Sequence, residues 1–92
     1  MDFSVREKEV LQSALLKWGK RSQVFMAVEE MAELTKELSK NDRGRSNTTE
    51  IAEEIADVEI MLEQMKIEFN IHSSVDIMRA GKIANLEQRI KK

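Results

Sequence analysis

The sequence contains no cysteine, proline or tyrosine, and it has only three glycines among 92 residues. Without cysteine, neither a disulfide framework nor a thiolate metal site can form. The single histidine, His72, cannot build a histidine-rich zinc site, and we expect it in a loop before the last helix. Good helix formers dominate the chain, and no segment shows the period-two alternation that a strand needs. We therefore predict an all-α protein.

Charge and hydropathy exclude two further classes of protein. The formal net charge is −2, so the chain has no overall basic field to hold a nucleic acid backbone. No apolar run approaches the roughly 20 residues that a membrane span needs. The polar, charged N-terminus has no signal-peptide core. We expect a cytoplasmic protein of one small domain, residues 1–92, that binds neither nucleic acid nor membrane.

Hydrophobic spacing predicts two helices in the first half of the chain. The first covers roughly Phe3–Trp18, and Gly19 suits the left-handed residue that often ends a helix. Ser22 can then N-cap a second helix that runs from about Gln23 to Lys40. The segment 41–46 is a loop by composition.

Two more helices are predicted in the second half. Asn47, followed by Glu50 three residues later, resembles a capping box and would begin a third helix that ends near Phe69. Asn70 can take the left-handed conformation after it. Ser73 can then cap a fourth helix, which continues to the end of the chain. The sequence therefore predicts a four-helix, bundle-like fold.

The most informative feature is an acidic segment that occurs twice. Residues 29–34 and 53–58 align at a constant offset of 24 residues. In a helix, residues three apart share one face, with Cβ atoms roughly 5–6 Å apart. Glu30 and Glu33 therefore form one carboxylate pair, and Glu54 and Asp57 form another. If the two helices pack side by side, four carboxylates converge, and such a cluster favours a hard cation such as Mg²⁺ or Mn²⁺.

The position of these carboxylates relative to the expected core supports a metal site. The apolar stripes expected to form the core are Val24, Val28, Met31, Thr35 and Leu38 on the second helix, and Ile51, Ile55, Val58, Leu62, Met65 and Phe69 on the third. The carboxylates lie beside these stripes, at the groove between the helices, where a purely solvated charge face would not usually lie. An isolated Glu-x-x-Glu pair is more often a solvated surface, but the matched repeat favours a metal site.

The pattern Glu29-Glu30-x-x-Glu33 followed by Glu54-x-x-Asp57 resembles the signature of the MazG-like, all-α nucleoside triphosphate pyrophosphohydrolases. The resemblance implies hydrolysis of a nucleoside or deoxynucleoside triphosphate between the α and β phosphates, giving a monophosphate and pyrophosphate, with a house-cleaning role. It also implies Mg²⁺, with Mn²⁺ as an alternative. The implied metal ligands are Glu30, Glu33, Glu54 and Asp57, and the residues implied to bind or orient the attacking water are Glu29 and Glu53.

The resemblance extends weakly over most of the chain. Trp18-Gly19 and Gln23 look similar to the family's first-helix region, and Lys82-x-x-Asn85 looks like its C-terminal substrate segment. With Arg89, these residues are the candidates for substrate binding: the basic groups suit a phosphate tail, and Asn85 suits a sugar or base edge. The residues alone also allow other roles. Basic side chains near a helix C-terminus complement its dipole, and Trp18 suits a core or a subunit interface.

A homo-oligomer is expected on two grounds. Apolar residues occupy several faces of a small chain, and the resemblance implies a dimer or tetramer whose active site is completed near subunit interfaces. One alternative is a non-enzymatic helical oligomerisation module, in which the acidic faces serve only solubility. Another is a di-iron carboxylate bundle, which is disfavoured because that design uses Glu-x-x-His pairs and no histidine stands at the required positions.

Overall fold

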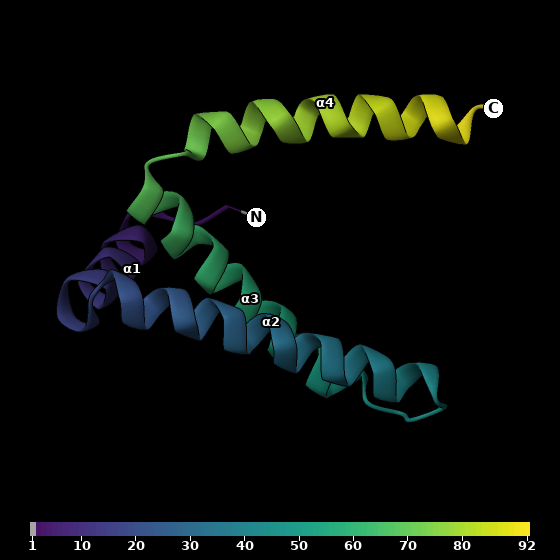
Figure 1. The fold of residues 1–92 in the computed structure, drawn as a ribbon, viewed down its shortest axis with the longest axis horizontal. Coiled ribbons are helices and arrows are strands. Elements are labelled where there is room, and N and C mark those ends of the chain that lie inside the picture. The colour runs from purple at the N-terminus through teal and green to yellow at the C-terminus, as the bar shows by residue number, and fades with distance from the viewer. Residues whose placement is uncertain (1) are drawn as a thin grey trace.

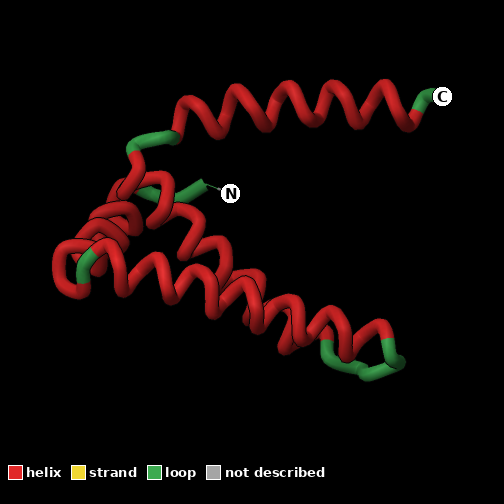
Figure 2. The backbone as a smooth tube through the Cα atoms, viewed as in Figure 1, coloured by secondary structure: helices red, strands yellow, loops and turns green. Residues whose placement is uncertain are grey.

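The computed structural model describes residues 2–92, and this part of the chain consists of helices joined by short loops, with no strand (Figure 2). The helices are α1 (Val5–Trp18), α2 (Lys20–Asp42), α3 (Thr48–Phe69) and α4 (His72–Ile90). The prediction of an all-α, four-helix chain is confirmed. Within residues 2–92, no helix combines the length and the apolar character needed to span a bilayer.

The helices α1, α2 and α3 pack together, whereas α4 projects from them as an arm. The helices α2 and α3 run antiparallel and side by side, and α1 packs against both at one end of the pair (Figure 1). Among the described residues 2–92, α4 packs on no helix except α3, from whose end it projects. The radius of gyration is 15.7 Å, compared with about 12 Å for a compact domain of this length. The protomer is therefore opened out, and most of the surface of α4 is uncovered.

The first helix begins two residues later than predicted, because a capping box fixes its start. The backbone N–H of Ser4 donates to Glu7 Oε1 at 2.8 Å, and the N–H of Glu7 donates to Ser4 Oγ at 3.1 Å. At the other end, Gly19 has a positive φ of 86°, but its ψ of 159° differs from the left-handed helical conformation that was predicted. This one residue reverses the chain direction, so α2 starts directly at Lys20. The prediction that Ser22 caps the second helix is therefore wrong, since Ser22 lies inside its first turn.

The junction between α3 and α4 is also shorter than predicted. The third helix ends at Phe69 as expected, and Asn70 takes the left-handed conformation at φ 53° and ψ 53°. Only Asn70 and Ile71 separate the two helices, because one left-handed residue already redirects the chain. His72 is therefore the first residue of α4, and the predictions that it lies in a loop and that Ser73 caps the helix are wrong.

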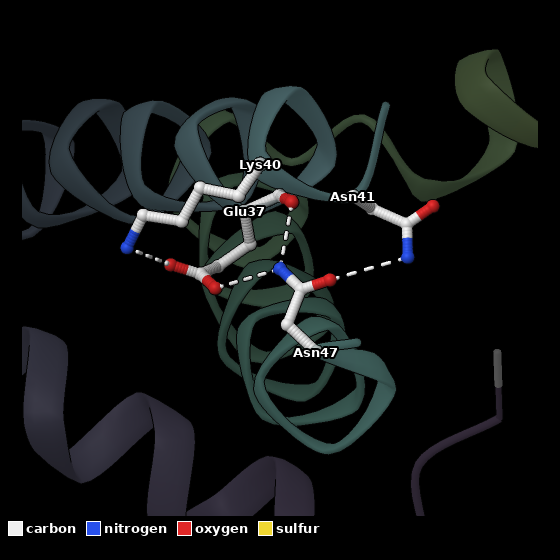
Figure 3. Close-up of polar contacts among 4 residues, drawn as sticks. All are labelled: Glu37, Lys40, Asn41 and Asn47. Atoms are coloured by element: carbon white, nitrogen blue, oxygen red, sulfur yellow. Dashed lines mark hydrogen bonds and ion pairs between the residues drawn. The ribbon is translucent and has the colours of Figure 1, made fainter. Parts of the chain in front are cut away.

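Asn47 precedes α3 but forms no capping box, which corrects the prediction. Its side chain makes no bond to the first turn of α3. Instead, its Nδ2 donates to the backbone O and to the carboxylate Oε1 of Glu37 on α2, both at 2.9 Å (Figure 3). A carboxylate is a stronger partner than a neutral group, so the buried amide joins the two helices rather than capping one of them.

The face that α2 turns towards α3 differs from the predicted one. The buried apolar core is small and consists of Leu11, Leu15, Ala27 and Met61. The predicted stripe on α2 is largely uncovered in the protomer: Val28, Met31 and Leu38 are 55%, 44% and 50% exposed. On α3 the stripe is divided, because Ile51, Val58 and Met65 are half-buried whereas Ile55, Leu62 and Phe69 are exposed.

The residues that α2 does bury are Gln23, Ala27 and Glu37. Ala27 is small and lets the helix backbones approach, and Glu37 gains its bond to Asn47 only when it faces α3. These contacts rotate the acidic side of α2 into the seam between the helices. The apolar stripe beside it faces outward as a result.

Candidate metal centre

The bond between Glu37 and Asn47 sets the register that brings the acidic residues together. Glu30 lies seven residues before Glu37, and Glu54 lies seven residues after Asn47. Seven residues are close to two helical turns, so each pair shares one side of its helix. Because α2 and α3 are antiparallel, the pairing of Glu37 with Asn47 also places Glu30 opposite Glu54.

Three carboxylates meet in this seam. One oxygen each from Glu30, Glu54 and Asp57 lies within 4.8 Å of the others. Glu30 and Glu54 are half-buried, and Asp57 is exposed. Ligand oxygens at the Mg²⁺ bonding distance lie roughly 3–4 Å apart, so small side-chain movements would close this set around one cation. The prediction that carboxylates from both repeats converge is therefore supported for these three residues.

The charge in the cluster is not compensated by the protein. Burial is the main cause that raises the pKa of Glu30, followed by a hydrogen bond to the Asp57 carboxyl and by the neighbouring negative charges. Burial is also the first cause that raises the pKa of Glu54, followed by the charges of Asp57, Glu33 and Glu37. In addition, Glu54 Oε2 is buried and has no hydrogen-bond partner. A raised pKa and a buried carboxylate oxygen without a protein donor are compatible with a cation-binding role for these side chains.

Two turns along the same seam, Glu37 shows the opposite behaviour. The hydrogen bond from Asn47 is the main cause that lowers the pKa of Glu37, and Lys40 adds to it. Lys40 Nζ lies 3.2 Å from Glu37 Oε2, and Asn41 Nδ2 donates to Asn47 Oδ1 at 3.2 Å (Figure 3). The helical pattern placed Glu37 on the face of Glu30 but did not predict its contact with Asn47. The seam between α2 and α3 therefore contains one carboxylate, Glu37, with hydrogen-bond and ion-pair partners, and one cluster of carboxylates whose charge is not paired.

The other predicted acidic residues lie at the edge of this cluster. Glu33 is exposed and lies outside the group of three, although its charge contributes to raising the pKa of both Glu30 and Glu54. Glu29 and Glu53 are both exposed. Their roles in orienting water, and that of Glu33 as a ligand, stay predictions.

The predicted substrate-binding residues are not gathered at the cluster. Lys82, Asn85 and Arg89 are exposed on α4, which is set apart from the α2–α3 seam (Figure 1). Trp18, at the end of α1, is 59% exposed, so it is not a core residue of the protomer. Gln23 is only 5% exposed and is buried in α2. Their binding roles also stay predictions.

Comparison of the chain with models of protein families, with curated proteins and with solved structures found no match. The likeness to MazG-like enzymes therefore stays a prediction from the acidic sequence motif. The three side chains offer only carboxylate oxygens, which suit hard cations rather than metals that prefer imidazole or thiolate.

Proposed function

We propose that this chain is a cytoplasmic, Mg²⁺-dependent hydrolase of nucleoside or deoxynucleoside triphosphates. It would cleave between the α and β phosphates and release a monophosphate and pyrophosphate, in the manner of the MazG-like family that its motif resembles. One observation carries the proposal: oxygens of Glu30, Glu54 and Asp57, from two helices, lie within 4.8 Å of one another. The unpaired buried oxygen of Glu54 supports the same conclusion.

The residues of the cluster divide into holding and orienting roles. Glu30, Glu54 and Asp57, with Glu33 at the edge, would hold Mg²⁺; Mn²⁺ suits the same oxygens. When bound, the cation would neutralise the triphosphate and stabilise charge that develops at the attacked phosphorus. Glu29 and Glu53 each adjoin a ligand in the sequence, and they are the candidates to bind, orient or deprotonate the attacking water.

A homo-oligomer, either a dimer or a tetramer, is part of the proposal. Phe25 and Val28 on α2 and Ile55 and Phe69 on α3 are all exposed in the protomer. Interfaces of obligate oligomers resemble a domain core cut in half, and these faces have that character. Light scattering should give a multiple of the chain mass at micromolar concentration, and a monomer mass would contradict this part of the proposal.

The oligomer also bears on substrate binding. Within residues 2–92, α4 packs on no helix except α3. Lys82, Asn85 and Arg89 would therefore meet the substrate through the α4 of a neighbouring chain or through movement of their own helix. Substitution of Lys82 by Gln should then raise KM for the triphosphate more than it lowers kcat. An unchanged KM would remove Lys82 from the binding site.

The test of the reaction is an assay that separates pyrophosphate from orthophosphate. A panel of canonical, deoxy and modified triphosphates should give monophosphate and pyrophosphate in the presence of Mg²⁺, and nothing in EDTA. Orthophosphate with a nucleoside diphosphate would mean cleavage at a different bond, and the likeness to the family would then be misleading.

The second candidate is a non-enzymatic oligomerisation or interaction module. It is favoured by the large exposed apolar side chains of α4, among them Ile77, Met78 and Ile90. On this hypothesis the acidic cluster is only surface charge, and divalent cations should not change the stability of the chain. If no triphosphate in the panel yields product, and if Mg²⁺ does not change the thermal melting temperature, the interaction module would be favoured over the hydrolase.

A further inference from the structure

The way in which α4 is attached sets it apart from the rest of the chain. Among the described residues 2–92, it packs on no helix except α3. The N–H of Val75 in α4 donates to Ile71 O at 2.9 Å, and two further backbone bonds run from the junction to α3: the N–H of Asn70 donates to Ile67 O at 3.2 Å, and the N–H of Ile71 donates to Lys66 O at 3.1 Å. The two bonds to Ile67 and Lys66 close the end of α3, and no backbone bond among residues 2–92 joins α4 directly to α3. Something else must fix the direction in which α4 leaves.

A buried carboxylate on α3 holds the first residue of α4. Glu63 is 3% exposed, and its Oε2 lies 2.6 Å from His72 Nε2. An ionised carboxylate can only accept, so His72 Nε2–H is the donor, and it can donate from a neutral or a charged ring. The other oxygen of Glu63 lies 4.0 Å from Lys66 Nζ. The His72 side chain is 41% exposed, so the bond is buried on the Glu63 side only. A short bond to a charged group is among the stronger polar contacts in proteins.

Among residues 2–92, the other side-chain ion pairs near α4 do not connect it to α3. Arg79 on α4 bonds Asp76 at 3.0 Å, and Lys91 pairs with Glu87 at 3.7 Å, but both contacts stay within the C-terminal segment. Within residues 2–92, the bond between His72 and Glu63 is the only side-chain hydrogen bond or ion pair that joins α4 to the remainder of the chain.

We propose that Glu63 and His72 form a pin that fixes the direction of α4 relative to α3. Both are positioning residues, since neither contacts the acidic cluster. The pin follows from the geometry of the junction and does not depend on the proposed function. Only its consequence depends on that function: the pin would set where Lys82, Asn85 and Arg89 are presented to a substrate.

A distance measurement tests the pin directly. The chain has no cysteine, so spin labels can be placed at Ala52→Cys on α3 and Gln88→Cys on α4, both exposed positions. Dilution with unlabelled chain restricts pulsed electron-electron distance measurements to pairs within one chain. The parent should give one narrow distance distribution, and His72→Ala should at least double its width while the far-ultraviolet circular dichroism stays helical.

Three further variants make the result specific. His72→Gln offers an amide donor at a similar place and should narrow the distribution again. Asp76→Asn breaks the exposed pair with Arg79 in the same turn and should match the parent. Glu63→Gln keeps the side-chain shape with a neutral acceptor and should give an intermediate width, and it decides the question if His72→Ala loses helix. A broad distribution in the parent, or an unchanged one in both His72→Ala and Glu63→Gln, would overturn the pin.

Activity gives an independent reading. If the proposed function holds, His72→Ala should raise KM several-fold with little change in kcat, because the metal cluster is untouched. A parent that releases no pyrophosphate would refute the function but leave the distance result standing. A broadened distribution with unchanged KM would retain the pin and remove its role in substrate binding.

Discussion

The α2–α3 pair and α4 are built from helices of similar length, 23 and 22 residues against 19, yet they are held in different ways. The pair buries Ala27, Met61 and several polar side chains along a shared seam. No residue of α4 is buried, and its large apolar side chains from Ile77 to Ile90 are between 44% and 74% exposed. Helical sequence alone therefore does not determine packing: a close approach also needs small residues at the seam and a loop that turns the chain back.

The comparison also separates two uses of buried charge. At the Asn47 end of the seam, Glu37 is paired and its lowered pKa favours the charged form. In the middle of the seam, the pKa values of Glu30 and Glu54 are raised and the charged form is opposed. At the base of α4, Glu63 is again paired, with His72. Under the proposed function, a bound cation would compensate this unpaired cluster.

The largest expected effect is on activity, and it should follow changes in the α2–α3 seam but not a matched change on α4. Glu54→Gln keeps the side-chain size but removes a ligand charge, so it should lower pyrophosphate release by roughly 100-fold or more. Because the ligands act as a unit, adding Asp57→Asn should cost little more. The matched control is Glu87→Gln on α4, whose exposed side chain faces Lys91 and whose loss should leave turnover unchanged. Full activity in Glu54→Gln would mean that the cluster is only surface charge.

The next effect concerns the metal and stability. A cation that binds only the folded chain stabilises it by about 2.7 kcal/mol at a hundred times its dissociation constant, which corresponds to a rise in Tm of roughly 10–20 °C for a domain of this size. Thermal melts in EDTA and in saturating Mg²⁺ should show this difference. It should shrink in Glu54→Gln and persist in Glu87→Gln. Superimposable melts of the parent with and without Mg²⁺ would argue against a metal centre.

A smaller effect tests what holds the seam in register. Asn47→Ala removes a buried amide with two bonds to α2 and should lower the free energy of unfolding by about 1–3 kcal/mol. Asn41→Ala removes an exposed partner of the same network and should cost less than about 0.5 kcal/mol. Urea unfolding of the two variants measures both values. Equal costs would show that the register does not depend on the Asn47 side chain.

The smallest effect is in the pH dependence of stability without metal. Raised pKa values mean that the folded chain binds protons more tightly than the unfolded chain at Glu30 and Glu54. The free energy of unfolding should therefore rise as the pH falls from about 7.5 to about 5, a window above the ordinary range of glutamate. The opposite contributions of Glu7 and Glu37, whose pKa values are lowered, are lost only at lower pH.

Glu54→Gln removes one of these groups and one neighbouring charge, so its stability should change less across the same window. Urea unfolding at several pH values in EDTA would measure the two slopes. A parent that loses stability as the pH falls towards 5 would have the wrong sign for an uncompensated acidic cluster.

The sequence determined those features that depend on local chemistry. The scarcity of helix breakers predicted an all-α chain, Gly19 and Asn70 were correctly expected at positive φ, and α3 ends at Phe69 as predicted. The two acidic repeats also predicted the approach of Glu30, Glu54 and Asp57. Each of these inferences needs only backbone preference or the helical period, which a short stretch of sequence already contains.

The tertiary structure alone decided which faces meet. The acidic side of α2 faces α3 because Glu37 bonds Asn47 across the seam, and this same bond took Asn47 away from its expected capping box. The start of α4 at His72 likewise depends on its junction with α3, where Glu63, nine residues earlier in the chain, holds the ring. A helical wheel shows the faces of one helix but not the helix against which it packs. The choice among its faces is made by contacts between residues far apart in sequence, and these exist only after the helices have packed.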